Sequence, residues 1–503
     1  MAILPKPASA LAVNRWLKQC IIRNLPKMKK YDAIIIGSGI GGLSCGCYLT
    51  KYGAKVLIVE QHSQAGGYCS SFSRAGYRFD VGVHYLGGLK RTFLKNIFDE
   101  LELTGTIQFK QFDPTDKITL PDRSTYIRAK LSETKSEFKN SFPKEAANIE
   151  RFFSFITRKD LFQIYKKIKR LNFQQILDEF FTDYKLKAAL EIMLCNFGLA
   201  ASQAAALTGV ILYRDYILDG GYYPEGGMQG LSQAFVNRFK SHGGELVLNK
   251  KVERILVQNK KARGVMLNDG ELLKADAVIS NADATQTIKQ LLADDDCKEA
   301  KIVDRLRVSP SLFVLYIGTD QDLGRFTNET CNIWSADTYR FGRFIAQLDK
   351  CLNRPSPPFL MISFPSAHRH GSNLKRKNTI QCFSIVPFKS SQFWNDYRAE
   401  LTERLISRTA KLLPDLENHI KVKVTATPLT FHRYSLNREG AGFGWASTPE
   451  QVRSTLFPPK SSIARLFFTG HWCTIGSGQG GVPKAIFSGR KTARIVLSTL
   501  GQM

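Results

Sequence analysis

Three glycines in one short stretch have the spacing of a phosphate-binding turn. Segment 31–60 contains a β-rich apolar run, then Gly37, Gly39 and Gly42, then a helical pattern and a second apolar run that ends on Glu60. Glycine lets the backbone turn tightly and approach a pyrophosphate, and the helix that follows directs its free N–H groups at the phosphates. The acid can accept hydrogen bonds from ribose hydroxyls. This order of elements predicts a dinucleotide-binding fold.

A second glycine pair follows Glu60 after a few residues. Segment 64–71 contains Gly66 and Gly67, which would carry the backbone past the flavin side of a cofactor. Together with segment 76–82, Gly-Tyr-Arg-Phe-Asp-Val-Gly, it resembles the FAD-dependent carotenoid desaturase, carotenoid isomerase and retinol saturase family, within the amine-oxidase-like flavoproteins. The resemblance implies that FAD is the cofactor and that the flavin performs the redox chemistry.

The resemblance continues in three later segments. In segment 220–282, Val252 matches a valine whose backbone lies on the adenine in these flavoproteins, and segment 466–490 returns the chain to the cofactor. His471 stands where the family usually has Asp or Glu, so the contact at this position stays open. Segment 427–445 is similar to a signature of the isomerase and saturase branch.

The cofactor-binding residues predicted from the glycine motif and from the resemblance form one set. Its members are Gly37, Ser38, Gly39, Ile40, Gly41, Gly42, Glu60, Gln61, Gly66, Gly67, Tyr68, Ser70, Val252, Gly470, His471, Gly480, Gly481 and Val482. The sequence names no general acid or base, because no histidine–carboxylate pair stands out. His84, His432 and Tyr434 are weak candidates, and for His84 a packed, hydrogen-bonded role is the favoured alternative. We expect no metal site.

The fold class that follows is α/β, with a Rossmann-type FAD-binding domain and an interleaved α+β substrate domain. A chain of 503 residues exceeds one ordinary core. The expected divisions are a basic N-terminal extension at 1–30, three FAD-binding parts at 31–106, 221–300 and 456–503, and two substrate-domain parts at 107–220 and 301–455.

Charge and composition restrict the partners. The net charge of +27 is compatible with nucleic acid, with an anionic lipid surface or with a generally basic surface. We expect no nucleic-acid partner, because the chain has neither zinc-ligand spacing nor an aromatic–basic RNA motif. The mean hydropathy of −0.19 excludes a multi-span membrane protein. Ten scattered cysteines without a C-x-x-C pair indicate buried thiols in a reducing compartment.

Three segments could contact a membrane. Residues 1–30 are basic and acid-free, and they form either an amphipathic surface anchor around 16–22 or a misassigned extension before Met28; a transit peptide ranks lowest. Segment 152–181 has apolar residues at helical spacing with Lys and Arg between them, which suits a bilayer interface or an ordinary surface helix equally. Segment 192–213 contains no acidic or basic side chain. We expect it to be buried core and tunnel wall, broken into two helices, rather than a transmembrane helix.

These observations predict an FAD-dependent oxidoreductase that acts on carbon–carbon double bonds of a long apolar polyene, such as a carotenoid or retinoid. Isomerase, saturase and desaturase remain open, and segment 427–445 favours the first two. Two alternatives are an amine or amino-acid oxidase of the same fold and a membrane-associated carrier without flavin. The resemblance further implies a quinone or oxygen as electron acceptor and a peripheral location on the cytoplasmic face of a membrane.

Overall fold

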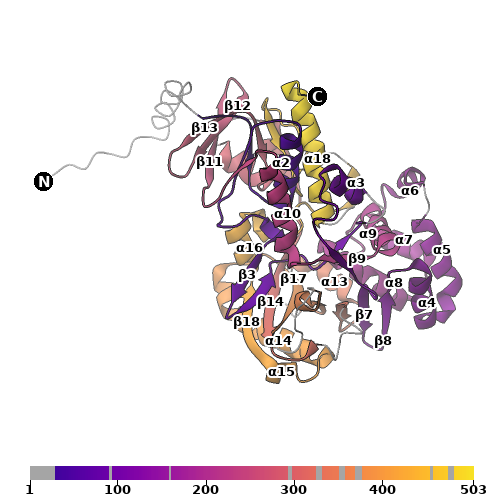
Figure 1. The fold of residues 1–503 in the computed structure, drawn as a ribbon. Coiled ribbons are helices and arrows are strands. Elements are labelled where there is room, and N and C mark those ends of the chain that lie inside the picture. The colour runs from indigo at the N-terminus through magenta and orange to yellow at the C-terminus, as the bar shows by residue number, and fades with distance from the viewer. Residues whose placement is uncertain are drawn as a thin grey trace.

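The fold combines two large sheets of seven strands each, two smaller sheets and a helical lobe (Figure 1). The computed structural model describes residues 29–89, 93–157, 160–292, 297–323, 331–350, 357–368, 377–453, 457–473 and 481–502. The predicted N-terminal extension, except for its last two residues, and the predicted cofactor residue Gly480 lie outside these ranges.

The first sheet is Rossmann-like and draws its strands from three distant parts of the chain. Its order is β10-β2-β1-β13-β12-β11, and β19 pairs with β13. The strands are β1 Lys30–Ile36, β2 Val56–Val59, β10 Glu245–Val247, β11 Val252–Gln258, β12 Lys261–Leu267, β13 Leu272–Ser280 and β19 Leu466–Phe468. The central β1 is parallel to both neighbours and buried over most of its length, which explains its continuous apolar run.

Three helices cover one side of this sheet in Figure 1: α2 Ile40–Lys51, α10 Gly227–Ser241 and α18 Gly481–Leu500. Helix α2 packs against both α10 and α18. A Cβ on Gly42 would lie 2.3 Å from the carbonyl oxygen of Gly37, so only glycine permits the close approach of this helix to the turn. The Rossmann-type part of the predicted fold is thereby confirmed.

The second sheet belongs to the interleaved domain. Its order is β18-β14-β17-β16-β15-β7-β8. The strands are β7 Asp116–Leu120, β8 Arg123–Ile127, β14 Ser311–Thr319, β15 Asn332–Ala336, β16 Phe359–Ser363, β17 Asn378–Val386 and β18 Ile420–Ala426. Strands β7 and β8 form an antiparallel hairpin, with Leu120 opposite Arg123 at its turn. Helix α14, Ser391–Leu412, packs on one face of the sheet through Trp394 and Tyr397, and the other face lines a cavity described below.

The helical lobe contains the segments suspected of membrane contact. Its helices are α4 Leu131–Ser141, α5 Ala146–Ile156, α6 Leu161–Ile168, α7 Phe173–Phe180, α8 Tyr184–Glu191, the short η4 Ile192–Phe197 and α9 Ala206–Asp219. Segment 152–181 is therefore three helices rather than one, because Asp160 and Asn172 cap new helix starts. Segment 192–213 is broken as predicted, at Gly198 in the left-handed conformation. No helix in the described part of the chain is long and apolar enough to cross a bilayer.

Shorter elements connect these layers. They are η2 Gly67–Cys69, β3 Ser71–Arg74, β4 Tyr77–Asp80, β5 Leu86–Gly87, α3 Phe93–Glu100, β6 Phe109–Gln111, η3 Pro143–Glu145, β9 Gly221–Pro224, α11 Ala284–Gln286, η5 Thr287–Leu291, α12 Lys298–Arg305, α13 Phe341–Ala346, η7 Leu348–Lys350, η8 Pro365–His368, α15 Leu416–His419, α16 Pro428–Ser435, η9 Arg438–Gly440 and α17 Pro449–Arg453. All eight cysteines within the described ranges are buried free thiols, which fits the prediction.

Candidate active site

The three nucleotide-binding segments meet at the start of α2. A Cβ on Gly41 would lie only 2.6 Å from Cα of Gly470, so the first and third segments touch backbone to backbone. Asn281, at the end of β13, lies between them, and its amide nitrogen donates to the carbonyl of Gly37 at 3.4 Å. A glycine at each contact point is what brings the three segments this close.

The N-terminus of α2 is prepared for an anion. Its N-cap is Gly39, which has no side chain to cap the helix, and its first turn contains no acidic residue. Gly39, Ile40 and Gly41 line a cavity of about 1000 Å³. Uncapped N–H groups and the positive end of the helix dipole suit the pyrophosphate of a dinucleotide.

Glu60 is held where a ribose would lie. One carboxylate oxygen accepts hydrogen bonds from the backbone N–H and the hydroxyl of Ser38, at 2.8 and 2.7 Å. The other accepts one from the backbone N–H of His62 at 3.0 Å. Glu60 also lines the cavity, with Val252 on the same wall, so its second oxygen has room to accept from a ribose hydroxyl.

A polar clasp joins the first and third segments to the loop after α16. The side-chain nitrogen of Asn437 donates to the hydroxyl of Tyr68 at 2.9 Å, and its oxygen accepts from the indole nitrogen of Trp472 at 3.2 Å. Trp445 in turn donates from its indole nitrogen to the carbonyl of Trp472 at 2.6 Å. The signature at 427–445 thus positions residues that line the cavity, and it does so from outside the Rossmann-like sheet.

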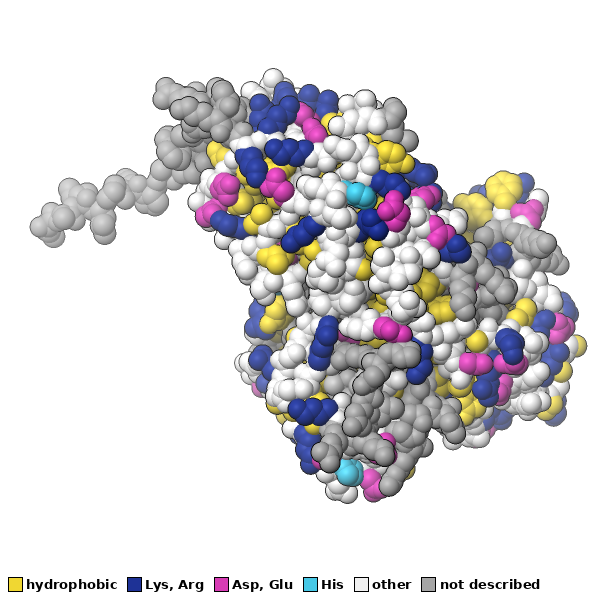
Figure 2. Space-filling view, viewed as in Figure 1, with side chains coloured by type: hydrophobic (Ala, Val, Ile, Leu, Met, Phe, Trp, Pro, Cys, Tyr) yellow, Lys and Arg dark blue, Asp and Glu magenta, His cyan; other side chains and the backbone are white. Residues whose placement is uncertain are grey.

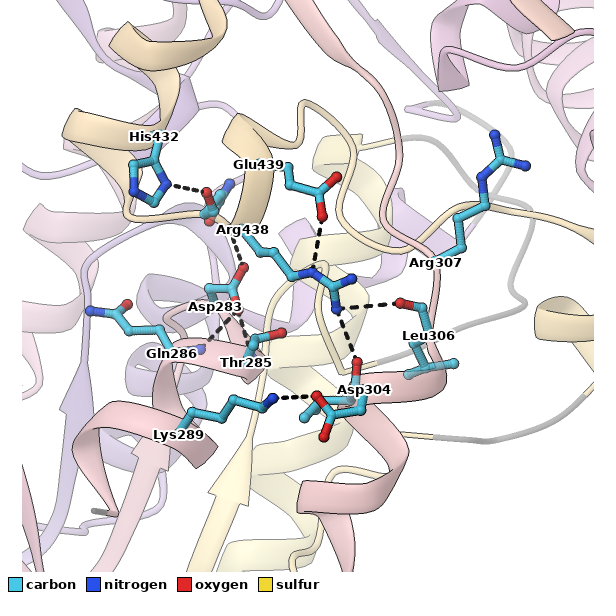
Figure 3. A network of polar contacts seen from close by, with 12 residues as sticks. Asp283, Thr285, Gln286, Lys289, Asp304, Leu306, Arg307, His432, Arg438 and Glu439 are labelled. Carbon is cyan, nitrogen blue, oxygen red and sulfur yellow. Dashed lines mark hydrogen bonds and ion pairs between the residues drawn. The ribbon is translucent and has the colours of Figure 1, made fainter. Parts of the chain in front are cut away.

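Figure 3 shows how this clasp is anchored. The backbone N–H of Arg438 donates to the Asp283 carboxylate at 2.7 Å, and the same carboxylate caps α11 by accepting from the backbone N–H groups of Thr285 and Gln286. The Arg438 guanidinium donates to backbone carbonyls of the α12 end, including that of Val303 at 3.0 Å. Burial raises the pKa of Asp283. Arg438, which follows Asn437, is therefore held both by its backbone N–H and by its guanidinium.

Two largely buried basic side chains lie close to the Gly470 turn. His471 lines it, and burial together with the positive charge of Lys484 lowers the pKa of the imidazole to about 3, so the ring is neutral at physiological pH. Lys484 lies in the first turn of α18, and burial lowers the pKa of its amine to about 8. His471 therefore cannot supply the negative charge of the Asp or Glu that the family usually has there.

A row of apolar side chains forms the wall of the cavity beyond the cofactor cradle. Cross-strand pairing aligns Ala426, Val314, Phe383, Met361 and Trp334 on five adjacent strands. All of these except Val314 line the cavity, and all are buried. Four strand spacings of about 4.8 Å make this row about 19 Å long. The cavity therefore continues from a dinucleotide cradle into a long apolar channel.

Polar groups gather where the row ends at β15. The buried carboxylate of Asp116 accepts from the Trp334 indole nitrogen at 2.6 Å and from the Tyr85 hydroxyl at 3.3 Å. Burial raises the pKa of Asp116 to about 7. His84 lines the cavity beside Tyr85 and Trp334, with ring centroids 4.5 and 5.8 Å away. Burial lowers the pKa of His84 to about 3, so its ring is neutral at physiological pH.

The structure brings most of the predicted cofactor residues together. Those lining the cavity are Gly37, Gly39, Ile40, Gly41, Glu60, Gln61, Gly66, Gly67, Tyr68, Ser70, Val252, Gly470, His471, Gly481 and Val482. Ser38 and Gly42 do not line it, because Ser38 holds Glu60 from behind and Gly42 packs on the turn. Of the weak catalytic candidates, His84 lies in the channel, Tyr434 lies exposed at the cavity rim, and His432 donates to the carbonyl of Asn437 at 2.8 Å.

Asn281 and Asn437 line the cavity and are absent from the predicted set. Asn281 follows a predicted buried strand, in the place where such strands deliver residues to a ligand, so its position was a usable signal. Asn437 lies within the recognised signature, but its partners Tyr68 and Trp472 are distant in sequence and nothing local indicates them.

The comparison with known families matches this geometry. The model of the flavin-containing amine oxidoreductases matches residues 40–497, nearly the whole chain. The chain belongs to this family. FAD is accordingly its cofactor, and the α2 start, Glu60 and the Gly470 turn are the parts of this chain that would hold it.

Curated relatives of the family are similar along most of the chain. The chloroplastic prolycopene isomerase of carrot is 27% identical to this chain, and the aligned region covers 98% of this chain and 84% of the isomerase. Rat all-trans-retinol 13,14-reductase is 25% identical, covering 86% and 80%. The neurosporene-forming phytoene desaturase of Cereibacter sphaeroides is 26% identical, covering 90% and 92%.

Solved structures share the fold at low identity. An oxidoreductase from Methanosarcina mazei has a TM-score of 0.65 at 17% identity, covering 92% of this chain and all of its own. Putrescine oxidase bound to putrescine has a TM-score of 0.63 at 14% identity, covering 93% and 99%. Both likenesses support the interleaved two-domain fold.

Proposed function

We propose that the protein is an FAD-dependent oxidoreductase that acts on carbon–carbon double bonds of a long apolar polyene. The observation that carries the proposal is the apolar row of Ala426, Phe383, Met361 and Trp334, which lines the same cavity as the cofactor cradle. A row of this length suits an extended apolar substrate. The curated relatives named for retinol, prolycopene and phytoene support this substrate class.

The roles of the protein are positioning and the exclusion of water. FAD, when bound, supplies hydride exchange with carbon. The aromatic and aliphatic wall holds a polyene extended and dry, and the clasp of Asn437, Tyr68 and Trp472 fixes the loop that closes the flavin end. Desaturation, saturation and redox-neutral isomerisation all need this arrangement. The part played by segment 427–445 in that clasp favours the isomerase and saturase branch.

An amine oxidase is the second candidate, since the fold neighbours include putrescine oxidase. A cationic amine buried in a cavity is stabilised by a counter-charge near the reacting carbon. Among the described residues that line the cavity, the only acidic side chain is Glu60, which lies at the nucleotide end. Neutral apolar wall residues at the other end favour the polyene.

The experiment that tests this function compares substrates on one preparation. Flavin-loaded protein is incubated with polyenes and, separately, with aliphatic amines, under oxidising conditions and with pre-reduced flavin, and the products are resolved by chromatography and mass. We expect a polyene product of unchanged mass, or one that gains or loses two hydrogens. In Met361→Trp, a bulky ring in the apolar row should suppress that product while flavin binding persists. Turnover of amines without any change in the polyenes would refute the proposal.

We further propose that α6 contacts the surface of a membrane, from the cytoplasmic side, where an apolar substrate would be dissolved. Phe162 is 61% exposed on this helix, and the amine of Lys166 lies 4.5 Å from the centre of its ring. Figure 2 shows exposed hydrophobic side chains over the same lobe. An aromatic ring flanked by Lys suits the headgroup region of an anionic bilayer.

Vesicle co-sedimentation tests the membrane contact. Phe162→Ser should reduce binding to phosphatidylserine-containing vesicles, whereas Tyr52→Ser, at an exposed aromatic residue just beyond the end of α2, should leave it unchanged. If both variants and the wild type bound the vesicles equally, α6 would not be the part of the protein that contacts the membrane. A quinone or oxygen as electron acceptor stays a prediction.

A further inference from the structure

The end of the channel at β15 holds two polar side chains in otherwise apolar surroundings. His84 and Asn196 both line the cavity, and their side chains interact. Their neighbours there include Trp334, Leu212 and Phe383, and the His84 ring centroid lies 6.0 Å from that of Phe383. Each side chain keeps hydrogen-bonding capacity beyond its contact with the other, and capacity left unmet in apolar surroundings is costly.

Nearby polar groups are already engaged elsewhere. The Trp334 indole nitrogen and the Tyr85 hydroxyl both donate to Asp116, which lies behind the wall. The amide nitrogen of Asn196 donates to the carbonyl of Met193 at 3.1 Å. This leaves the amide oxygen of Asn196 and the His84 ring to face a ligand.

The surroundings of His84 determine which ring nitrogen carries the proton. Nδ1 is buried and has no hydrogen-bond partner among the described residues. A buried N–H without an acceptor is rarer, and more costly, than a bare lone pair. The proton therefore belongs on Nε2, where it can be shared with the amide oxygen of Asn196.

We propose that His84 and Asn196 bind a terminal hydroxyl group of the substrate, so that the preferred polyene is an alcohol and not a pure hydrocarbon. Nε2–H can divide its hydrogen bond between the amide oxygen of Asn196 and a ligand oxygen, and that amide oxygen has a second lone pair that can accept from the ligand. Together these groups match a hydroxyl, which both accepts and donates. A carboxylate would face the amide oxygen with no cation from this pair, and an ammonium would meet no anion. This inference rests on the proposed function and specifies its substrate.

The test measures binding to flavin-loaded protein with two matched probes. They are a polyene alcohol and the hydrocarbon in which a methyl group replaces the terminal carbinol, both presented in the same detergent and followed by quenching of tryptophan fluorescence. Because the probes partition differently into detergent, the quantity compared is the affinity ratio of alcohol to hydrocarbon in each variant. The variants are His84→Phe, Asn196→Leu and, as a control on the apolar row, Met361→Leu.

Loss of one of the two hydrogen bonds predicts that the ratio falls about 2- to 10-fold from the wild type to His84→Phe. Asn196→Leu should lower it about 2- to 10-fold, and Met361→Leu should change both affinities equally and leave the ratio unchanged. An unchanged flavin spectrum shows that each variant is folded. A ratio in His84→Phe equal to that of the wild type, with both probes binding, would overturn the inference alone. A wild type that binds neither probe would overturn the polyene function as well.

Discussion

Replacement of Gly41 by alanine should damage FAD binding, because the added methyl group would enter the contact between the first and third nucleotide-binding segments. The new Cβ would lie 2.6 Å from Cα and 3.0 Å from the backbone nitrogen of Gly470, and 2.8 Å from the side-chain oxygen of Asn281. Ordinary contacts between heavy atoms begin near 3.5 Å. Gly470 has a φ of +82°, which restricts how its backbone can move aside.

The magnitude follows from two opposed effects. Overpacking of a close contact costs about 1–3 kcal/mol, and exchange of glycine for alanine inside a helix recovers about 0.5–1 kcal/mol. The unfolding free energy should therefore fall by about 0–2.5 kcal/mol. The strain falls on the two segments that meet at Gly41 and Gly470. If these segments move apart to relieve it, the cofactor cradle widens, and FAD binding should weaken about 5- to 100-fold.

Gly46→Ala is the matched control on the same helix. Its Cβ would meet the Ile58 methyl at 2.9 Å and the Phe239 ring at 3.1 Å, and these are side-chain atoms that can move. We expect FAD affinity within about twofold of the wild type, since the site faces away from the cofactor. Apoprotein titrated with FAD, followed by flavin fluorescence, measures both variants. Equal FAD affinities for Gly41→Ala and the wild type would refute the claim that the first and third segments touch at the cofactor site.

Three further predictions follow from the same contacts. Glu60→Gln should weaken FAD binding about 10-fold, because charge-assisted hydrogen bonds to the ribose are lost. The same titration measures this, and an unchanged affinity would show that Glu60 does not contact the cofactor. Asn437→Leu should lower unfolding free energy by about 1–3 kcal/mol in denaturant titrations, because it leaves the buried Trp472 indole nitrogen without its acceptor; an unaffected midpoint would contradict the clasp. Asp116 has a pKa of about 7, raised by burial, so its protonated form is favoured in the folded state and its contribution to stability is lost as pH rises from about 4 to 7. The unfolding free energy of the wild type should fall by up to about 4 kcal/mol relative to that of Asp116→Asn over this pH range. Parallel plots of unfolding free energy against pH for the two proteins would contradict this.

The nucleotide-binding half was predictable because its signals are local. The glycines, the apolar strands and Glu60 follow one another within thirty residues, and each has a physical role that its own neighbours determine. The caps that break segment 152–181 were also local, since Asn172 and Gln175 form a capping box that the sequence contains. Apolar periodicity continues across these caps and predicts one continuous helix, whereas the structure has three.

The substrate channel could not be predicted in the same way. Strands β14 to β17 are buried on both faces, so they show no alternation that would tell which side chains face the cavity. The row from Ala426 to Trp334 depends on the register of five strands, and the clasp of Asn437 depends on a contact across 369 residues. Both arise only from the tertiary fold.

The most direct test of the central claim places flavin and polyene in one cuvette. Flavin-loaded protein is photoreduced without oxygen, a polyene is added at equal concentration, and the absorption of both chromophores is followed through one turnover. The account predicts that the polyene spectrum changes on the loaded protein and stays constant on the flavin-free protein. A polyene whose spectrum is unchanged beside bound, reduced flavin would contradict the claim that one cavity holds both.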